Sequence, residues 1–351
     1  MVTIEQLTNF CTSAMSSVGA EQQDAATVAD ALVMADSWGV FTHGSKLLHD
    51  YLLKIQAGGI SVKNKPIVDR DGPAWANVQA NSVMGHVAGK FAMEVAIEKA
   101  RQTGVAYVGV QNTNHYGAAG YYAWLAAREG LIGLSMANDI PSVAAPGSRK
   151  AVTGSNPLSY GIPCRKDQDP ILLDMAISTV AGGKVYAAIQ RGESIPDNWI
   201  VGPDGLPTTN GSLYPAEASL QPMSGPKGYG IALLVETLSG VLTGAAMTSQ
   251  VGSWIWGEKS KPTNHGAAFI AIDIQSIMPA GEFERRISHL VDEIHNSPTA
   301  EGVDSVMLPG EREWNHRHQA LEKGLELPAD VMAKLKNVAE LIDEQPVWMT
   351  D

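Results

Sequence analysis

The sequence predicts an α/β protein in which a helical region built from both termini flanks a central domain. In the central part, strand-like and helix-like segments alternate along the chain, which is typical of α/β domains. Towards both ends, the apolar residues recur mainly at helical intervals. No G-x-G-x-x-G follows a predicted strand, which weighs against a Rossmann domain. We place the central domain at residues 71–255 and the helical region at 1–70 and 256–351.

Helices are predicted for most of residues 3–57. Thr3 and Gln6 are spaced as in a capping box, which marks the start of a first helix. A second helix ends at Gly39, and a third runs over about 42–57. The apolar face of the third helix consists of Leu48, Leu52 and Ile55.

The central alternation is read from runs of period two and runs of period 3.6. Strands are expected at 75–80, 105–112, 131–139, 151–163, 170–176 and 267–274, and helices at 85–104, 118–130, 178–192, 225–242 and 283–296. Residues 192–222 hold five prolines and little periodicity. This composition predicts a long ordered excursion, that is, a segment outside the regular alternation of strands and helices.

The acidic composition argues against nucleic acid as a partner. The chain has 25 Lys and Arg residues against 37 Asp and Glu residues, a formal net charge of −12. Phosphate backbones need a basic surface. A small anionic substrate remains compatible, because one lysine can reverse the field inside a cleft.

The cysteines and the apolar runs indicate a cytoplasmic protein without a membrane span. Cys11 and Cys164 form neither a zinc-type spacing nor a disulfide framework. The longest apolar stretch, 229–247, contains Glu236 and is better explained by a buried helix. The N-terminus shows no secretory signal. His316 and His318 lack a clear third ligand, so no metal site is expected.

Two glycine-flanked motifs could carry chemistry. GPKGYG (225–230) places Lys227 at a helix start, where free N–H groups suit a phosphate, but a solvated lysine at a glycine-rich helix start is an equal reading. NTNHYGAAGYY (112–122) places His115 after a strand, where α/β proteins bind ligands. A histidine there can move a proton near neutral pH or merely hydrogen-bond the turn.

Two further positions have the same ambiguity. Asp174 ends an apolar strand, where it could orient a histidine, hold a sugar hydroxyl or cap the next helix. His43 begins the third predicted helix, where it could face a substrate or be only a polar residue at a helix start.

Taken together, the motifs resemble the malate/L-lactate dehydrogenase family sometimes called type 2, which includes ureidoglycolate, sulfolactate and diketogulonate oxidoreductases. The matching stretches run in family order through nearly the whole chain: THG (42–44), NHYGAAGYY (114–122), GSNPLSYGIP (154–163), LDMA (173–176), GPKGYGIALLVETLSGVLTGA (225–245) and LPGERE (308–313). Each stretch is weak alone, but the combination is highly specific.

The resemblance implies a sulfolactate-dehydrogenase-like, non-Rossmann fold in which a central mixed sheet binds the cofactor. It also implies a homodimer or higher homo-oligomer. The implied activity is NAD(P)-dependent interconversion of a small 2-hydroxy acid and its 2-oxo acid; we expect NAD and leave NADP open. The implied cofactor contacts are Asp139, Asp174, Met175, Ala176, Lys227, Pro309, Gly310 and Glu311.

The resemblance also implies the catalytic residues. Hydroxyl oxidation by hydride loss needs a base for the proton. His115 and His43 have catalytic roles in different members; we assign the proton to His115, place His43 beside the substrate, and keep the reverse assignment as an alternative. Asn156 is expected to contact the substrate.

One departure from the family pattern concerns the substrate carboxylate. Many members carry an Arg four residues after the first histidine, but here the position is Leu47. Lys46 lies three residues after His43, and on a helix both spacings fall near one face. We therefore expect Lys46 to contact the substrate as a point charge without a guanidinium fork.

Two alternatives accompany this hypothesis. One is reduction of a cyclic ketimine or a diketo-sugar acid at the same kind of site. The other is a catalytically silent nucleotide-binding protein. The joint presence of His43, His115, Asp174 and Lys227 counts against the silent protein.

Overall fold

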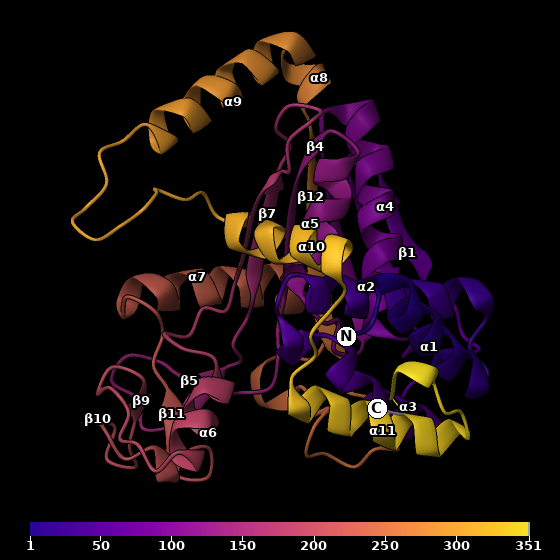
Figure 1. The fold of residues 1–351 in the computed structure, drawn as a ribbon, viewed down its shortest axis with the longest axis vertical. Helices are drawn as coiled ribbons and strands as arrows, with labels where there is room; N and C mark the ends of the chain where they lie inside the picture. The colour runs from indigo at the N-terminus through magenta and orange to yellow at the C-terminus, as the bar shows by residue number, and fades with distance from the viewer. Residues whose placement is uncertain (350–351) are drawn as a thin grey trace.

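The computed structural model describes residues 1–349, which form a large mixed sheet with helices and a smaller lobe beside it (Figure 1). Among these residues the large sheet has seven strands in the order β1-β2-β3-β12-β4-β7-β8. The strands are β1 (Ile67–Gly72), β2 (Trp75–Gln79), β3 (Val105–Thr113), β4 (Leu131–Ala137), β7 (Leu158–Ile162), β8 (Ile171–Met175) and β12 (His265–Asp273).

The order of the large sheet confirms a mixed, non-Rossmann α/β fold. Only β2 and β3 pair in parallel, and the other neighbours within the sheet are antiparallel. The expected boundary at 255 falls before β12, which lies between β3 and β4. The segment assigned to the helical region thus supplies a central strand.

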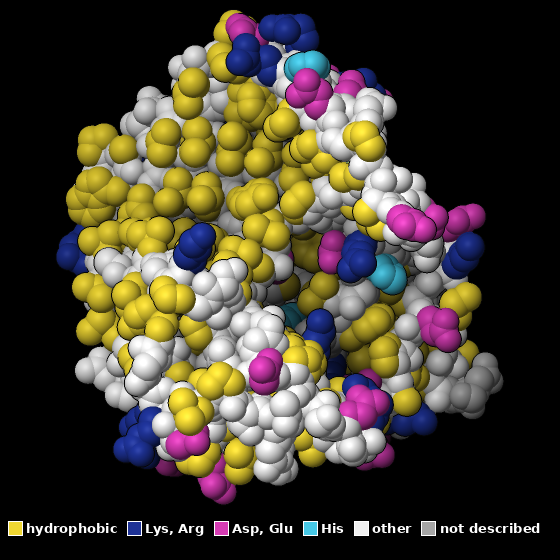
Figure 2. All heavy atoms as spheres, turned by 90° about the vertical axis from the view of Figure 1, so that its left-hand side faces the viewer, with side chains coloured by type: hydrophobic (Ala, Val, Ile, Leu, Met, Phe, Trp, Pro, Cys, Tyr) yellow, Lys and Arg dark blue, Asp and Glu magenta, His cyan; other side chains and the backbone are white. Residues whose placement is uncertain are grey.

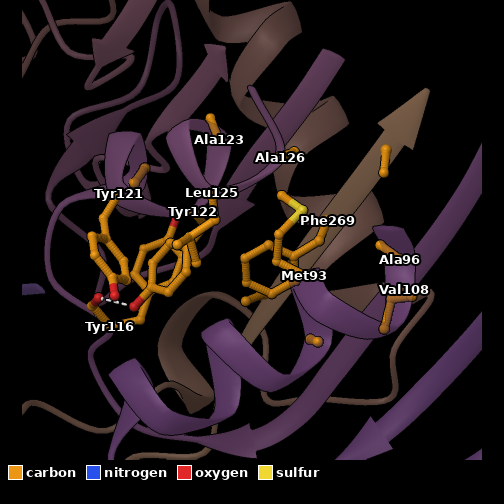
Figure 3. Packing of buried hydrophobic residues seen from close by; sticks show 14 of the residues in the cluster. Met93, Ala96, Val108, Tyr116, Tyr121, Tyr122, Ala123, Leu125, Ala126 and Phe269 are labelled. Atoms are coloured by element: carbon orange, nitrogen blue, oxygen red, sulfur yellow. Dashed lines mark hydrogen bonds between the residues drawn. The ribbon is translucent and has the colours of Figure 1, made fainter. Parts of the chain in front are cut away.

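Two helices cover one face of the large sheet and complete its core. These are α4 (Gly85–Thr103) and α5 (Ala119–Arg128). Tyr116 stacks on Tyr122 with ring centroids 4.8 Å apart. Phe269 of β12 packs next to them (Figure 3). The sheet can approach α5 closely because residue 161 is glycine. A Cβ at this position would lie 2.5 Å from the Ala123 carbonyl oxygen.

The expected excursion at 192–222 belongs to a smaller lobe with its own core. Its five-stranded sheet has the order β10-β9-β11-β5-β6. The strands are β5 (Val143–Ala144), β6 (Ala151–Thr153), β9 (Ile200–Val201), β10 (Pro207–Thr208) and β11 (Ser219–Leu220), and α6 (Gly182–Gln190) packs beside them.

The helical region combines helices from the N-terminal and the C-terminal parts of the chain. It contains α1 (Ile4–Ser17), α2 (Gln22–Ser37), α3 (Leu48–Gln56), α10 (Glu311–Lys323) and α11 (Ala329–Ile342). Figure 1 shows the N-terminal helices beside the C-terminal ones. Their shared core includes Leu7, Leu32 and Leu335, all fully buried. The capping box of Thr3 and Gln6 is confirmed.

The remaining helices lie at the edges of these units. They are α7 (Pro226–Glu236), which continues as a π-helical turn over Thr237–Val241, α8 (Ile274–Ile277) and α9 (Ala280–His295). Short 3₁₀ turns occupy Phe41–His43, Ser45–Leu47, Gly211–Leu213, Thr248–Gln250 and Val347–Met349. No helix within residues 1–349 is long and apolar enough to cross a bilayer.

The third predicted helix begins later than expected. Two 3₁₀ turns, one ending at His43 and one starting at Ser45, precede α3, and Gly44 between them is extended. The cause is the buried carboxylate of Asp36, which accepts the Ser45 N–H at 2.9 Å. A Cβ on Gly44 would overlap that carboxylate. The chain therefore breaks at Gly44 and turns His43 away from the axis of α3.

The same contact links stability to pH. Burial raises the pKa of Asp36 to about 7 although its hydrogen bonds to Ser45 act in the opposite direction, whereas the ordinary value is 3.8. The folded protein therefore holds this proton more tightly than the unfolded chain. The stabilising contribution is fully present below the unfolded pKa and is lost as the pH rises through the folded value.

We predict that Asp36→Asn removes this dependence, because the amide oxygen can still accept the Ser45 N–H but no charge forms at high pH. In urea unfolding from about pH 5 to about pH 8, the variant should gain stability relative to wild type as the pH rises. The control Asp304→Asn removes an exposed carboxylate and should show no trend. A difference that stays constant with pH for Asp36→Asn would contradict the prediction.

Candidate active site

A cluster of aromatic and histidine side chains lies where the helical region meets the large sheet. His115 follows β3, and its side chain is largely buried. Its ring stacks on Trp254 with centroids 3.9 Å apart, and the ring of His43 lies 5.8 Å away. The structure thus brings together the two histidines that sequence reasoning selected, His43 from the helical region and His115 from the sheet.

Tyr51 of α3 is the direct partner of His115. Its hydroxyl lies 2.6 Å from His115 Nδ1, and both side chains are buried. The Tyr51 ring also makes a T-shaped contact with the buried His86 ring, with centroids 5.4 Å apart. Neither nitrogen of His86 has a hydrogen-bond partner among the described residues, and burial lowers its pKa to about 3. His86 therefore stays neutral.

His265 and Asp139 form a pair beside this cluster. His265, at the start of β12, places Nε2 3.0 Å from Asp139 Oδ1 and Nδ1 2.8 Å from Thr263 Oγ1. Asp139 Oδ1 also accepts the N–H of Ile140. Asp139, expected to contact cofactor, is thus held by His265 just after β4, with its side chain partly exposed.

The loop that carries Trp254 is fastened to α3. The buried Lys54 ammonium donates to the carbonyl oxygens of Lys261 at 2.7 Å and Lys259 at 3.5 Å. Asp50 on the same helix pairs with the Lys259 side chain at 3.7 Å. One helix therefore holds both the His115 ring, through Tyr51, and the loop that covers it.

The environment keeps His43 and His115 neutral near pH 7. Burial lowers the pKa of His115 well below its ordinary value, and His43, His265 and His86 add to this. Burial also lowers the pKa of His43, although the charge of Asp139 partly offsets the effect. Neutral imidazoles can accept a proton or donate an N–H to a polar substrate atom.

The other expected cofactor residues lie in and after β8, at the start of α7 and in the turn before α10. Asp174, in β8, accepts the Gly120 N–H at the start of α5 through Oδ2, at 2.7 Å. Met175 and Ala176 follow it and are partly exposed. Met223 N–H donates to the carbonyl oxygen of Ile177, which ties the start of α7 to the same segment. The exposed Lys227 lies in the first turn of α7.

The turn before α10 runs against β8. The Leu172 N–H donates to the Pro309 carbonyl oxygen at 3.0 Å, and Gly310 adopts a positive φ of 93° beside Leu172. Glu311 accepts the Leu308 N–H and lies 2.7 Å from His295 Nε2. Pro309 and Glu311 line a cavity of about 530 Å³, within the usual range for ligand pockets.

The structure corrects the expectation for Asn156. Its side chain is fully buried and donates to Glu236 Oε2 at 2.7 Å and to the Ala232 carbonyl oxygen at 3.2 Å. Glu236 in turn accepts the Thr248 N–H. Asn156 therefore fastens α7 to the loop between β6 and β7. Its side chain has no surface open to a substrate.

The structure also corrects the helical argument for Lys46. Because Gly44 interrupts the helix, His43 and Lys46 do not share a helical face. Lys46 instead pairs with Asp330 of α11, and both side chains keep substantial exposure. Leu47 is buried in the helical core, which explains why this position is apolar here.

Sequence reasoning missed four members of the cluster: Tyr51, His86, Trp254 and His265. Tyr51 lies seven residues before Gly58 on the same face as Leu48 and Leu52, so its spacing reads as core. His86 and His265 occupy a helix start and a strand start without a local motif. Contacts between distant segments place them together.

The described residues contain no group of three or more His, Cys, Asp or Glu side chains arranged for a metal ion.

The chain is similar to known dehydrogenases over nearly its whole length. A model of the family described as malate/L-lactate dehydrogenase matches residues 2–336. A malate dehydrogenase of Pyrococcus abyssi is 36% identical over 345 residues, covering 96% of this chain and 94% of the relative. A ureidoglycolate dehydrogenase (NAD(+)) of Escherichia coli O157:H7 is 35% identical over 327 residues, covering 93% and 92%.

Solved structures agree with the sequence relatives. The sulfolactate dehydrogenase of Methanocaldococcus jannaschii superposes with a TM-score of 0.91 at 32% identity, covering 98% of each chain. A Δ1-piperideine-2-carboxylate reductase of Pseudomonas syringae pvar. tomato superposes with a TM-score of 0.85 at 28% identity, covering 97% of this chain and 99% of that one.

Proposed function

The chain belongs to the malate/L-lactate dehydrogenase family, and from this premise we propose that it interconverts a small 2-hydroxy acid and its 2-oxo acid with a nicotinamide coenzyme. The observation that carries the proposal is the pair of neutral histidines, His43 and His115, with rings 5.8 Å apart. Oxidation of a hydroxyl requires a proton acceptor and a hydrogen-bond donor at one oxygen, and two neutral imidazoles supply both.

The coenzyme would supply hydride acceptance and donation when bound. The residues along its expected path fit a dinucleotide by their chemistry. Asp174 Oδ1 can accept a hydrogen bond from a hydroxyl or an amide, because Oδ2 alone takes the Gly120 N–H. Lys227 brings a positive charge to the start of α7, which suits a diphosphate. The cavity beside Pro309 and Glu311 offers room for one end of the molecule.

The same cavity favours NAD over NADP. Its lining includes the carboxylates of Asp167, Asp169 and Glu311, and none of the described residues that line it is Lys or Arg. A 2′-phosphate would meet repulsion there without a lining Lys or Arg to pair with. We therefore propose NAD as the coenzyme.

The substrate would lie between His43, His115 and the Trp254 loop. The enclosed aromatic surroundings suit a compact molecule with one polar end. Lys46 is the nearest lysine or arginine along the chain to His43, and its exposed pairing with Asp330 is weak enough to yield to a substrate carboxylate. We propose a small 2-hydroxy acid anion on these grounds.

Reduction of a cyclic ketimine acid is a second candidate. The superposition on Δ1-piperideine-2-carboxylate reductase favours it, since the fold accommodates that reaction in the solved protein. In such a reaction the substrate nitrogen takes the place of the hydroxyl oxygen. The histidine pair would serve either atom.

A second copy of the chain would cover an apolar face. Figure 2 shows hydrophobic side chains gathered over a wide area of one side of the molecule, with few charged groups among them. Leu233 and Leu234 of α7 and Val241 and Leu242 after it are between 44% and 57% exposed. Apolar surface this extensive is typical of an oligomer interface. We propose a homodimer formed through α7, and a cytoplasmic location in keeping with the free thiols of Cys11 and Cys164.

A substrate screen tests the activity. Malate, lactate, ureidoglycolate, sulfolactate and a cyclic ketimine acid are assayed with both coenzymes by the absorbance of the reduced nicotinamide. We expect turnover of at least one 2-hydroxy acid, with kcat/KM at least about tenfold higher for NAD than for NADP. The double variant His43→Asn/His115→Asn serves as the inactive control. Binding of NADH without turnover of any acid would favour a silent nucleotide-binding protein instead.

Analytical ultracentrifugation tests the dimer. The variant Leu234→Glu places a charge in the proposed interface and should sediment as a single chain, whereas wild type should sediment as two. Leu206→Glu changes a leucine in the smaller lobe that is at least as exposed and should leave the dimer intact. A wild-type protein that sediments as one chain, or a dimeric Leu234→Glu variant, would contradict this arrangement.

A further inference from the structure

The contact between Tyr51 and His115 determines which nitrogen of His115 carries a proton. The Tyr51 hydroxyl has His115 Nδ1, 2.6 Å away, as its sole hydrogen-bond partner within residues 1–349. Tyr51 is 2% exposed, so its hydroxyl has little access to solvent. All the hydrogen bonding of this phenol is therefore directed at one imidazole nitrogen.

Two arrangements of this bond are conceivable, and burial separates them. If the phenol donates, Nδ1 accepts, and the proton of neutral His115 lies on Nε2. If Nδ1 donates, the phenol hydrogen is buried without an acceptor, which carries the full desolvation penalty. Burial, with the charges of Asp139 and Asp50, raises the pKa of Tyr51 well above its ordinary value, so the phenol keeps its hydrogen. The arrangement in which Tyr51 donates is the favoured one.

Neighbouring rings keep the imidazole in this orientation. Trp254 stacks on one face of His115 at an interplanar angle of 15°, and Tyr51 is stacked at 29°. The groups that face His115 from other elements are His43, His86 and His265, all of which disfavour its protonation. A flip of the His115 ring would place a ring carbon, in place of Nδ1, against the Tyr51 hydroxyl and break this hydrogen bond.

We infer that Tyr51 holds neutral His115 with its proton on Nε2, so that His115 donates a hydrogen bond to the reacting oxygen of the substrate and His43 accepts the hydroxyl proton. In oxidation, the C–H bond at C2 would break, and a bound nicotinamide coenzyme would supply hydride acceptance. The O–H proton goes to the free nitrogen of His43, and a C=O double bond forms. His115 keeps its proton and stabilises the negative charge that develops on the oxygen, as oriented donors do.

This division of roles is the reverse of the assignment preferred from the sequence, and it follows from the hydrogen bonds already made. His115 Nε2 can accept a proton only if the proton of the neutral ring lies on Nδ1. Nδ1 could then no longer accept from Tyr51, and the phenol hydrogen would be left unpaired. His43 has no such obstacle, because its Nδ1 lies 3.0 Å from the hydroxyl of the exposed Thr42, which can donate or accept. Tyr51 is thus a positioning residue that acts through His115.

This inference rests on the proposed function only for the roles of the histidines, and the tautomer can be measured without any substrate. Full-length protein labelled with ¹⁵N in its histidine rings gives two-bond ¹H–¹⁵N correlations that identify the protonated nitrogen of each neutral imidazole. The His115 signals are assigned by their loss in His115→Gln. We expect His115 in wild type to carry its proton on Nε2.

Tyr51→Phe removes the donor while keeping the ring, and the His115 correlations should then shift towards the Nδ1-protonated form. The matched control Tyr121→Phe removes a buried hydroxyl that bonds Asp30 elsewhere and should leave the His115 signals unchanged. A wild-type His115 protonated on Nδ1, or one unchanged by Tyr51→Phe, overturns the inference whether or not an acid is turned over.

Kinetics supply the second readout. With an acid that wild type oxidises, Tyr51→Phe should lower kcat by at least about tenfold, the equivalent of one misplaced hydrogen bond. KM should change by less than about twofold, because the substrate contacts remain. An unchanged kcat with the expected tautomer shift overturns the division of roles and leaves the dehydrogenase proposal standing. Absence of turnover in wild type would refute the dehydrogenase proposal alone.

Discussion

The buried hydrogen bond from the Tyr51 hydroxyl to His115 Nδ1 is the contact on which the arrangement of the site depends. It joins α3 of the helical region to the loop after β3, two parts of the chain that share no local sequence motif. Through Lys54 the same helix also fastens the loop that carries Trp254. The site exists because these parts meet, and one hydrogen bond sets both the orientation and the protonation of the histidine at its centre.

A second constraint places His43 opposite His115. The carboxylate of Asp36 takes the N–H of Ser45, and Gly44 is extended because a Cβ there would overlap that carboxylate. The helix cannot begin until Leu48, so His43 lies on a separate turn whose ring faces the His115 ring. The mixed sheet contributes by bringing β12 between β3 and β4, which puts His265 and Asp139 beside the pair.

Much of this architecture could be predicted from sequence because it depends on periodicity and on motifs. The strands and helices of the central domain follow the alternation of apolar residues, and the resemblance to the malate/L-lactate dehydrogenase family follows from stretches spread along the chain. The break at Gly44 could not be predicted, since it depends on a carboxylate eight residues earlier. Asn156 lies in a family motif, yet its side chain is hydrogen-bonded to Glu236 of α7, eighty residues later in the sequence. Tyr51 reads as an ordinary core residue until His115 is seen beside its hydroxyl.

The central claim is that two neutral histidines share the work at one oxygen, with His43 as the proton acceptor and His115 as the donor of a hydrogen bond. The most direct measurement is single-turnover hydride transfer from the 2-hydroxy acid across a range of pH, in His43→Asn and in His115→Asn. The account predicts that His43→Asn lowers the rate by at least about a hundredfold and abolishes its pH dependence, as expected for loss of a general base. His115→Asn should lower the rate and keep the pH dependence. A His43→Asn variant with an intact rate, or a His115→Asn variant without pH dependence, would contradict the account.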